Sequence, residues 1–154
     1  MEAVWTADQR GLKVTKESQK ALWLNGLMMI VFKKRRKETK NIDWPDHVVP
    51  LDENSFDDFI RKYPLSVVDF YADWCQPCKV MYPRMRKLSK AYKGKVAFGR
   101  VNVQEEKVLA KKFKVVGIPT FIFFSYGKKL LSISGTRSVG NMKEIIEKLL
   151  GRIK

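Results

Sequence analysis

The stretch Val68-Asp-Phe-Tyr-Ala-Asp-Trp-Cys-Gln-Pro-Cys-Lys79 carries most of the information in this sequence. It continues an almost unbroken apolar run that begins at Leu65, which is the pattern of a β-strand covered on both faces. Cys75 and Cys78 follow that strand directly and open a segment whose apolar residues recur at helical spacing. The cysteine pair therefore lies at a predicted strand-to-helix junction.

Two cysteines with two residues between them have a defined chemical use at such a junction. The free N–H groups and the positive end of the helix dipole favour a thiolate at the first cysteine. The second cysteine lies about one turn further along, close enough to attack a mixed disulfide and resolve it. Half of a zinc site has the same spacing, but the chain holds only these two cysteines and one histidine, His47. Since a structural zinc site needs four ligands and a disulfide scaffold needs more cysteines, we favour redox chemistry and expect no metal.

Working outward, the chain alternates between strand and helix patterns from about Asp43 onward. Met81, Met85, Leu88 and Tyr92 line one side of a long helix, in which Pro83 should introduce a kink. The other predicted strands are residues 48–51, 95–103, 120–126 and 129–134, the last two forming a hairpin across Gly127. The other predicted helices are one capped by Asn54-Ser55 and ended by Pro64, one over 106–113, and one carrying the apolar stripe of 142–150.

The predicted order of elements is β-α-β-α-β-α-β-β-α. Helices on both faces of a sheet are the natural way to bury apolar strands in this order. The fold class is therefore α/β, with a central mixed β-sheet flanked by helices on both faces.

From about residue 46 to residue 150, the sequence resembles the thioredoxin family. The resemblance includes the stretch 68–79, Pro83 in the following helix, Gly117-Ile-Pro-Thr120 before the hairpin, and Gly135 after it. Several separated motifs in the right order are more specific than a cysteine pair alone. The resemblance implies a thioredoxin fold and the activity of a thioredoxin-like protein-disulfide reductase, a thiol–disulfide oxidoreductase.

The resemblance also implies roles for individual residues. Cys75 corresponds to the attacking cysteine, Cys78 to the resolving cysteine, and Asp69 to a buried carboxylate that accepts the proton of the second thiol. Pro119 corresponds to a cis-proline that faces the disulfide, and the backbone of Ile118 pairs with the substrate chain. The other residues expected at the substrate-docking surface are Trp74, Gln76, Pro77, Ser134 and Gly135.

At two positions the chain departs from the family pattern. Gln76 stands where thioredoxins most often have glycine, which adds bulk and an amide beside the attacking cysteine. Arg100 stands where a lysine near the buried aspartate is common. Because a guanidinium does not lose its proton in proteins, Arg100 should not relay one.

The residues between the cysteines also indicate the direction of electron flow. Proline, rather than the histidine common in oxidising relatives, precedes Cys78. A less stabilised thiolate means a more stable disulfide, so the dithiol is the better electron donor. The sequence contains no Gly-x-Gly-x-x-Gly motif of a nucleotide-binding protein, so we expect no bound cofactor and a thioredoxin reductase as the electron donor. For a reductase of this kind we expect disulfide-containing proteins as substrates and a reducing compartment, the cytoplasm, as its location.

The charge of the chain supports an alternative from another class. The 31 Lys and Arg residues against 16 Asp and Glu give a formal net charge of +15, which favours anionic partners. The alternative is a non-enzymatic basic module that binds or tethers through this charge. We expect no specific nucleic-acid binding, because no recognition motif accompanies the scattered lysines.

We predict two parts, a basic N-terminal extension over residues 1–41 and a thioredoxin domain over residues 42–154. The extension holds a twelve-residue apolar run, 21–32, and the basic cluster Lys33–Lys37. The run is shorter than the roughly 17–25 residues that span a bilayer, and its flanks differ from those of a secretory signal. Three interpretations remain: a helix that docks on a protein, which we favour; a weak anionic-membrane contact through residues 21–37, with the domain cytoplasmic; and an extension without function.

Overall fold

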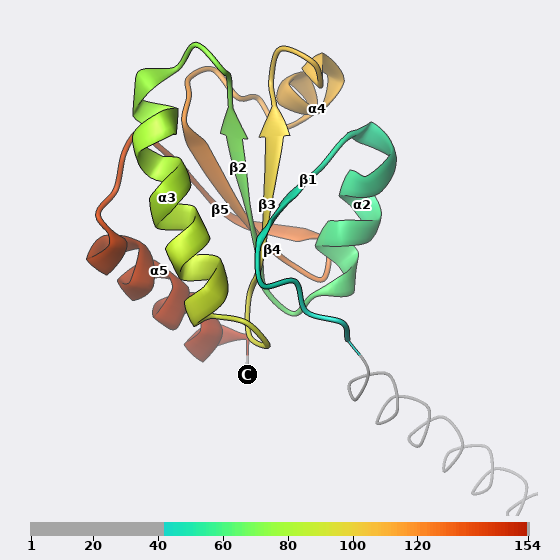
Figure 1. The fold of residues 1–154 in the computed structure, drawn as a ribbon. Helices are drawn as coiled ribbons and strands as arrows, with labels where there is room; N and C mark the ends of the chain where they lie inside the picture. The colour runs from blue at the N-terminus through green and yellow to red at the C-terminus, as the bar shows by residue number, and fades with distance from the viewer. Residues whose placement is uncertain (1–41, 154) are drawn as a thin grey trace, which may run out of the picture. The chain divides into compact units, whose positions relative to one another are not determined.

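A computed structural model describes residues 42–153, and the predicted order of elements is confirmed over this range (Figure 1). The strands are β1 (Val48–Pro50), β2 (Ser66–Tyr71), β3 (Ala97–Asn102), β4 (Thr120–Ser125) and β5 (Lys128–Ser134). The helices are α2 (Glu53–Lys62), α3 (Gln76–Ala91), α4 (Lys107–Lys112) and α5 (Val139–Arg152).

The strands form one mixed sheet in the order β1-β3-β2-β4-β5. β1, β3 and β2 are parallel, whereas β4 is antiparallel to β2, and β5 to β4. The β4–β5 hairpin closes through Tyr126 and Gly127, whose φ angles of 45° and 86° match the two-residue turn that fits the twist of a hairpin. The predicted hairpin is therefore confirmed, and β2 lies at the centre of the sheet.

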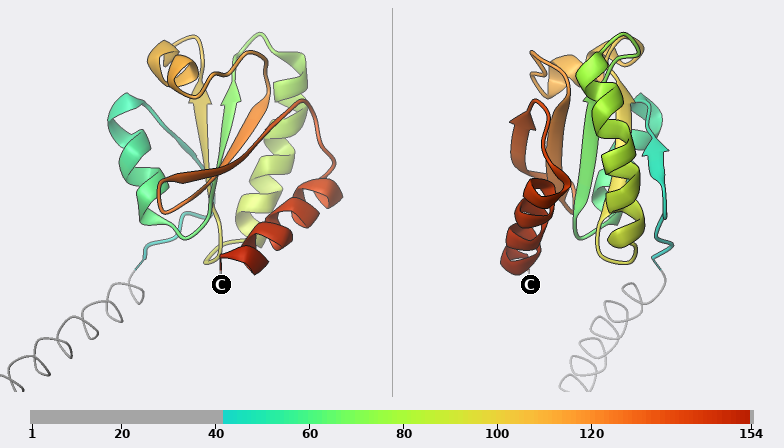
Figure 2. Two further views of the ribbon diagram at one scale, coloured as in Figure 1. Left: turned by 180° about the vertical axis from the view of Figure 1, so that it is seen from behind. Right: turned by 60° about the vertical axis from the view of Figure 1, so that its left-hand side comes forward.

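Helices cover both faces of the sheet, as predicted (Figure 2). On one face, Met81 and Met85 of α3 and Met142 and Ile146 of α5 pack against strand residues such as Phe98. On the other face, the ring of Phe56 in α2 lies 5.1–6.3 Å from the rings of Phe70, Phe113 and Phe124. Burial of these side chains on both faces of β2 explains its almost continuous apolar run.

The start of α2 differs from the prediction. Asp52, rather than Asn54-Ser55, is the N-cap, and its carboxylate accepts a hydrogen bond of 2.8 Å from the Ser55 N–H. The Asp52 N–H in turn donates to Ser55 Oγ at 3.1 Å. This reciprocal capping box begins the helix two residues earlier than a single cap at Asn54 would allow.

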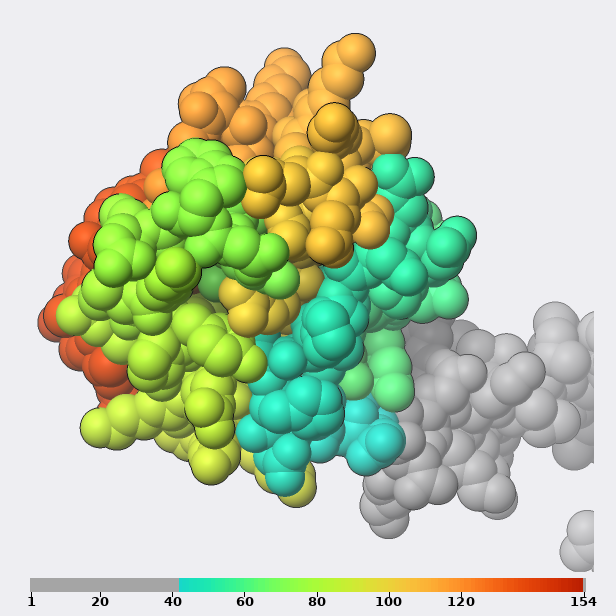
Figure 3. All heavy atoms as spheres, turned by 45° about the horizontal axis from the view of Figure 1, so that its top comes forward, coloured from blue at the N-terminus to red at the C-terminus, as the bar shows by residue number. Residues whose placement is uncertain are grey.

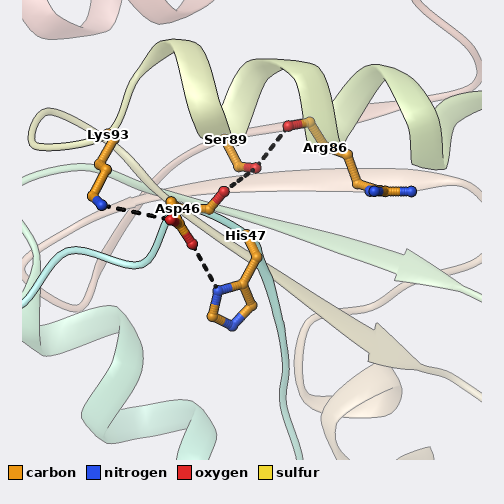
Figure 4. A network of polar contacts seen from close by, with 5 residues as sticks. All are labelled: Asp46, His47, Arg86, Ser89 and Lys93. Carbon is orange, nitrogen blue, oxygen red and sulfur yellow. Dashed lines mark hydrogen bonds and ion pairs between the residues drawn. The ribbon is translucent and has the colours of Figure 1, made fainter.

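The segment before β1 is attached to the end of α3 by a polar network centred on Asp46 (Figure 4). Lys93 Nζ lies 3.5 Å from one carboxylate oxygen of Asp46, and His47 Nδ1 lies 3.4 Å from the other. Ser89 Oγ is within hydrogen-bond distance of the carbonyl oxygens of Asp46 (3.4 Å) and Arg86 (2.9 Å). These contacts orient the chain as it enters β1.

The N-terminal predictions, including the apolar run 21–32 and the basic cluster Lys33–Lys37, lie outside the residues that the structure describes. Within residues 42–153, none of the helices combines the length and the apolar character needed to cross a bilayer.

Candidate active site

Cys75 and Cys78 lie where β2 ends and α3 begins, as the sequence predicts. They form a disulfide, with their Cα atoms 5.3 Å apart. Both residues are buried, and they pack with Ala72, Tyr71 and Ile118. Figure 3 views the molecule toward this end of the sheet, where the first turn of α3 lies beside the segment that leads into β4.

The backbone of α3 is arranged to stabilise negative charge on Cys75. Cys75 is the N-cap of the helix, and its Sγ accepts a hydrogen bond of 3.2 Å from the Cys78 N–H. Gln76 and Pro77 occupy the first helical turn, where proline is well tolerated because its missing N–H would be unpaired there. In the reduced protein, the same N–H group and the helix dipole favour a thiolate at Cys75.

A groove of about 480 Å³ lies beside Cys75. Its lining is mostly apolar and includes Trp74, which is 68% exposed, and Val116, which is fully exposed. Of the predicted docking residues, Trp74, Gln76, Pro77 and Ile118 line this groove. The groove is also lined by residues that were not predicted as site residues, namely Val103, Val115, Val116 and Gly117. The paired valines directly before Gly117-Ile118 were the available signal.

Pro119, Ser134 and Gly135 come together at the start of β4 and the end of β5. The Ile118–Pro119 peptide bond is cis, as the family resemblance implies. The Gly135 N–H donates to the Pro119 carbonyl oxygen at 2.8 Å, and Ser134 Oγ lies 2.8 Å from Thr120 Oγ1. These three residues are not among those that line the groove beside Cys75, but Pro119 directly follows Ile118, which does line it.

Asp69 is buried on β2, and neither of its carboxylate oxygens has a hydrogen-bond partner. Burial raises the pKa of Asp69 to about 7, and the opposing effect of the Arg100 charge is smaller. The carboxyl group is thus able to exchange a proton near neutral pH, which is the property that a proton acceptor for a thiol needs.

A second hollow, of about 270 Å³, is bordered by Cys78 and Arg100. Tyr71 and Tyr82 also border it, and neither was among the predicted site residues. No sequence signal identified them, because their rings come from β2 and α3 and meet only in the folded chain.

Across residues 42–153, no group of three or more His, Cys, Asp or Glu side chains is placed to hold a metal ion.

A strand-to-helix junction that holds a buried Cys75–Cys78 disulfide beside an apolar groove defines a thiol–disulfide oxidoreductase. Comparison with known proteins specifies the family. The family model described as Thioredoxin matches residues 47–148. The chain is 37% identical over 103 residues to a thioredoxin of Staphylococcus saprophyticus. The aligned region covers 67% of this chain and 98% of that protein.

Solved structures give the same answer. A mutant thioredoxin from Halobacterium salinarum superposes with a TM-score of 0.66 at 27% identity, covering 71% of this chain and 96% of that one. A thioredoxin from Plasmodium falciparum superposes with a TM-score of 0.61 at 32% identity, covering 66% and 98%. The chain belongs to the thioredoxin family. It is a protein-disulfide reductase, and the alternative of a non-enzymatic basic module is not favoured.

Proposed function

We propose that Cys75 is the attacking cysteine and Cys78 the resolving cysteine. The observation that carries this assignment is that Cys75 lines the groove and its Sγ accepts the Cys78 N–H, whereas Cys78 borders the second hollow. A substrate disulfide in the groove therefore reaches Cys75 first. Both cysteines are buried, so the assignment depends on which hollow each one borders.

The proposed reaction has two steps that together move two electrons to the substrate. The Cys75 thiolate attacks one substrate sulfur, which forms a mixed disulfide and releases the other sulfur as a thiolate. Cys78 then loses its proton and attacks Cys75 Sγ, which forms the Cys75–Cys78 disulfide and releases the second substrate thiolate.

Asp69 is the proposed acceptor of the Cys78 proton. Its burial on β2 and a pKa of about 7 support this role, because the carboxylate and carboxylic acid forms are both populated at neutral pH. Arg100, opposite Asp69 on β3, borders the same hollow as Cys78.

The proposed substrate contacts are those of the groove and its border. Trp74, Gln76, Pro77 and Ile118 would contact side chains next to the substrate disulfide, and the backbone of Ile118 would pair with the substrate chain. The border residues Pro119, Ser134 and Gly135 would limit how the substrate chain lies.

We further propose that the protein uses no bound cofactor and receives electrons from a thioredoxin reductase. Its proposed location is the cytoplasm, where thiols are kept reduced. For the N-terminal segment, docking on a protein is the first proposal, and a weak contact of residues 21–37 with anionic membranes, supported by the apolar run and the Lys33–Lys37 cluster, is the alternative.

A dithiothreitol-driven assay of protein-disulfide reduction tests the proposed function. The wild-type chain should turn over many equivalents of substrate, and both single cysteine variants should not. In the same assay, Asp69→Asn should slow resolution at neutral pH by about tenfold or more, because a general base typically contributes at least that much. Wild-type resolution kinetics in Asp69→Asn would remove Asp69 from the mechanism.

A further inference from the structure

The guanidinium of Arg100 lies between two tyrosine rings. Its Cζ atom is 3.4 Å from the ring centroid of Tyr71 on β2 and 4.2 Å from that of Tyr82 on α3. We call this arrangement the Tyr71–Arg100–Tyr82 stack. A cation over the face of an aromatic ring is attracted by the ring's quadrupole, and two such rings hold a planar guanidinium better than a lysine ammonium.

Without the stack, Arg100 would have little reason to remain at this position. Its Nε atom is buried and has no hydrogen-bond partner, which is unfavourable for a polar group. Arginine side chains at the surface normally extend their charged end into water. The two rings therefore supply the contacts that keep the guanidinium close to the sheet.

The placement of Arg100 matters most for Asp69, because it keeps a positive charge near the buried carboxyl group. Asp69 and Arg100 are direct neighbours in the register of β2 and β3, and both carboxylate oxygens of Asp69 lack hydrogen-bond partners. The α3 residues that border the hollow beside Arg100 are Cys78, Lys79 and Tyr82. On β4, the uncharged Phe121 is opposite Asp69 in the register of β2 and β4. On the chain of β2 itself, Tyr71 and Asp73 border the same hollow.

We propose that Tyr71 and Tyr82 are positioning residues for the transfer of the Cys78 proton, because they hold Arg100 beside Asp69 as a fixed positive charge. This inference rests on the proposed role of Asp69. The held cation favours the carboxylate form of Asp69, which is the form able to accept a proton. Because a guanidinium stays charged throughout the physiological pH range, its influence does not change with pH.

The test is a titration of the Asp69 carboxyl group, followed by carbon NMR in the full-length oxidised protein and its variants. Tyr82→Leu keeps an apolar side chain over the hollow but removes the aromatic face, so the midpoint should rise by about half a pH unit. Tyr71→Leu tests the same contact from a different element and should give a shift of the same sign. Arg100→Met removes the charge and should raise the midpoint by about one unit or more.

Two matched controls separate the stack from general disturbance. Tyr82→Phe keeps the ring and loses only the hydroxyl group, so the midpoint should not move. Arg86→Gln removes a guanidinium that lies 5.9 Å from the Tyr82 ring but leaves Arg100 in place, and it should not move the midpoint either.

The direction of the shift decides the outcome. An unchanged midpoint in the folded leucine variants, or in Arg100→Met, overturns the proposal. A lower midpoint in the leucine variants also overturns it, because the rings would then act by excluding water rather than by holding a cation.

Single-turnover reduction of a symmetric aromatic disulfide, whose second released thiolate reports resolution, separates this inference from the proposed function. The pH profile of that second release should shift with the Asp69 midpoint. A shifted midpoint with an unshifted profile would overturn the role of Asp69, and with it the catalytic part of the inference, while leaving the stack itself established.

Discussion

Asp69 and Arg100 stand opposite each other on neighbouring parallel strands, yet neither carboxylate oxygen of Asp69 accepts a hydrogen bond. Opposite charges at this spacing would ordinarily form an ion pair that repays part of the cost of burial. Here the guanidinium is stacked between Tyr71 and Tyr82. The Arg100 charge acts on Asp69 without a hydrogen bond between the two groups, and burial has the larger effect on the pKa of Asp69.

The buried carboxyl group makes the stability of the protein depend on pH. Well below the ordinary pKa of 3.8, Asp69 is protonated in both the folded and the unfolded state, so no charge is buried on folding. As the pH rises from the ordinary value of 3.8 through the folded-state pKa of about 7, the unfolded state loses its proton first, so stability falls. Asp69→Asn should therefore raise the free energy of unfolding by about 4 kcal/mol above pH 8 and by little near pH 3.5.

Urea unfolding of both proteins between pH 3.5 and pH 9 measures this difference. Asp57→Asn is a suitable control, because Asp57 lies at the surface, where it pairs with Lys112 at 3.3 Å. Its effect on stability should be small at every pH. A gain from Asp69→Asn that is equal at both ends of the pH range would contradict the account of Asp69 as a buried charge.

The two cysteines should fail in different ways when each is replaced. Cys75→Ser removes the attacking thiol and should abolish turnover without forming adducts. Cys78→Ser should still attack substrates but accumulate mixed disulfides at Cys75, detectable by mass spectrometry after mixing with a disulfide protein. With limiting alkylating reagent, the reduced wild-type protein should be labelled first at Cys75. Preferential labelling of Cys78 would reverse the assignment.

Val116 should contribute to substrate docking without contributing to stability. It is fully exposed and lines the groove beside Cys75. Val116→Asp places a charge where a substrate side chain would be buried, so kcat/KM for a protein disulfide should fall about tenfold, with unfolding unchanged. Val108→Asp is the matched control, since Val108 is 61% exposed on α4 and is not a groove residue. Equal losses in the two variants would show that the groove does not bind substrate.

Removal of residues 1–41 tests the predicted division of the chain. All motifs of the redox site lie after this segment, so the shortened chain should fold and retain dithiothreitol-driven activity close to that of the full-length protein. Loss of folding or activity would show that the segment belongs to the domain. Co-sedimentation with anionic vesicles by the full-length protein alone would support the membrane contact of residues 21–37, and binding by neither protein would oppose it.

Much of the fold follows from local sequence patterns. The unbroken apolar run of β2, the helical spacing after Cys75 and the break at Gly127 each act within a few residues, so the order of elements was predictable. The α2 N-cap was misplaced because Asp52, Asn54 and Ser55 are all good capping residues. Which of these three residues becomes the N-cap depends on where the chain leaves β1.

In the candidate site, too, some residues are predictable from local sequence and others come together only through the fold. Cys75, Cys78, Trp74, Gln76 and Pro77 are contiguous, and the strand-to-helix junction alone places them together. Ile118 and Pro119 were linked to them by family resemblance, because contact between segments some forty residues apart leaves no local pattern. Val103 was not predicted, for the same reason.

The sequence by itself determined the α/β class, the redox pair and its position at the start of a helix, because these depend on short-range periodicity and helix-end chemistry. Only the tertiary structure decided the environment of that pair. The placement of Arg100 between Tyr71 and Tyr82 and the unpaired burial of Asp69 depend on the register of β2 against β3 and on the packing of α3 over them. Charge, burial and pKa are set by groups that are close in space, and the fold brings these together from three separate elements.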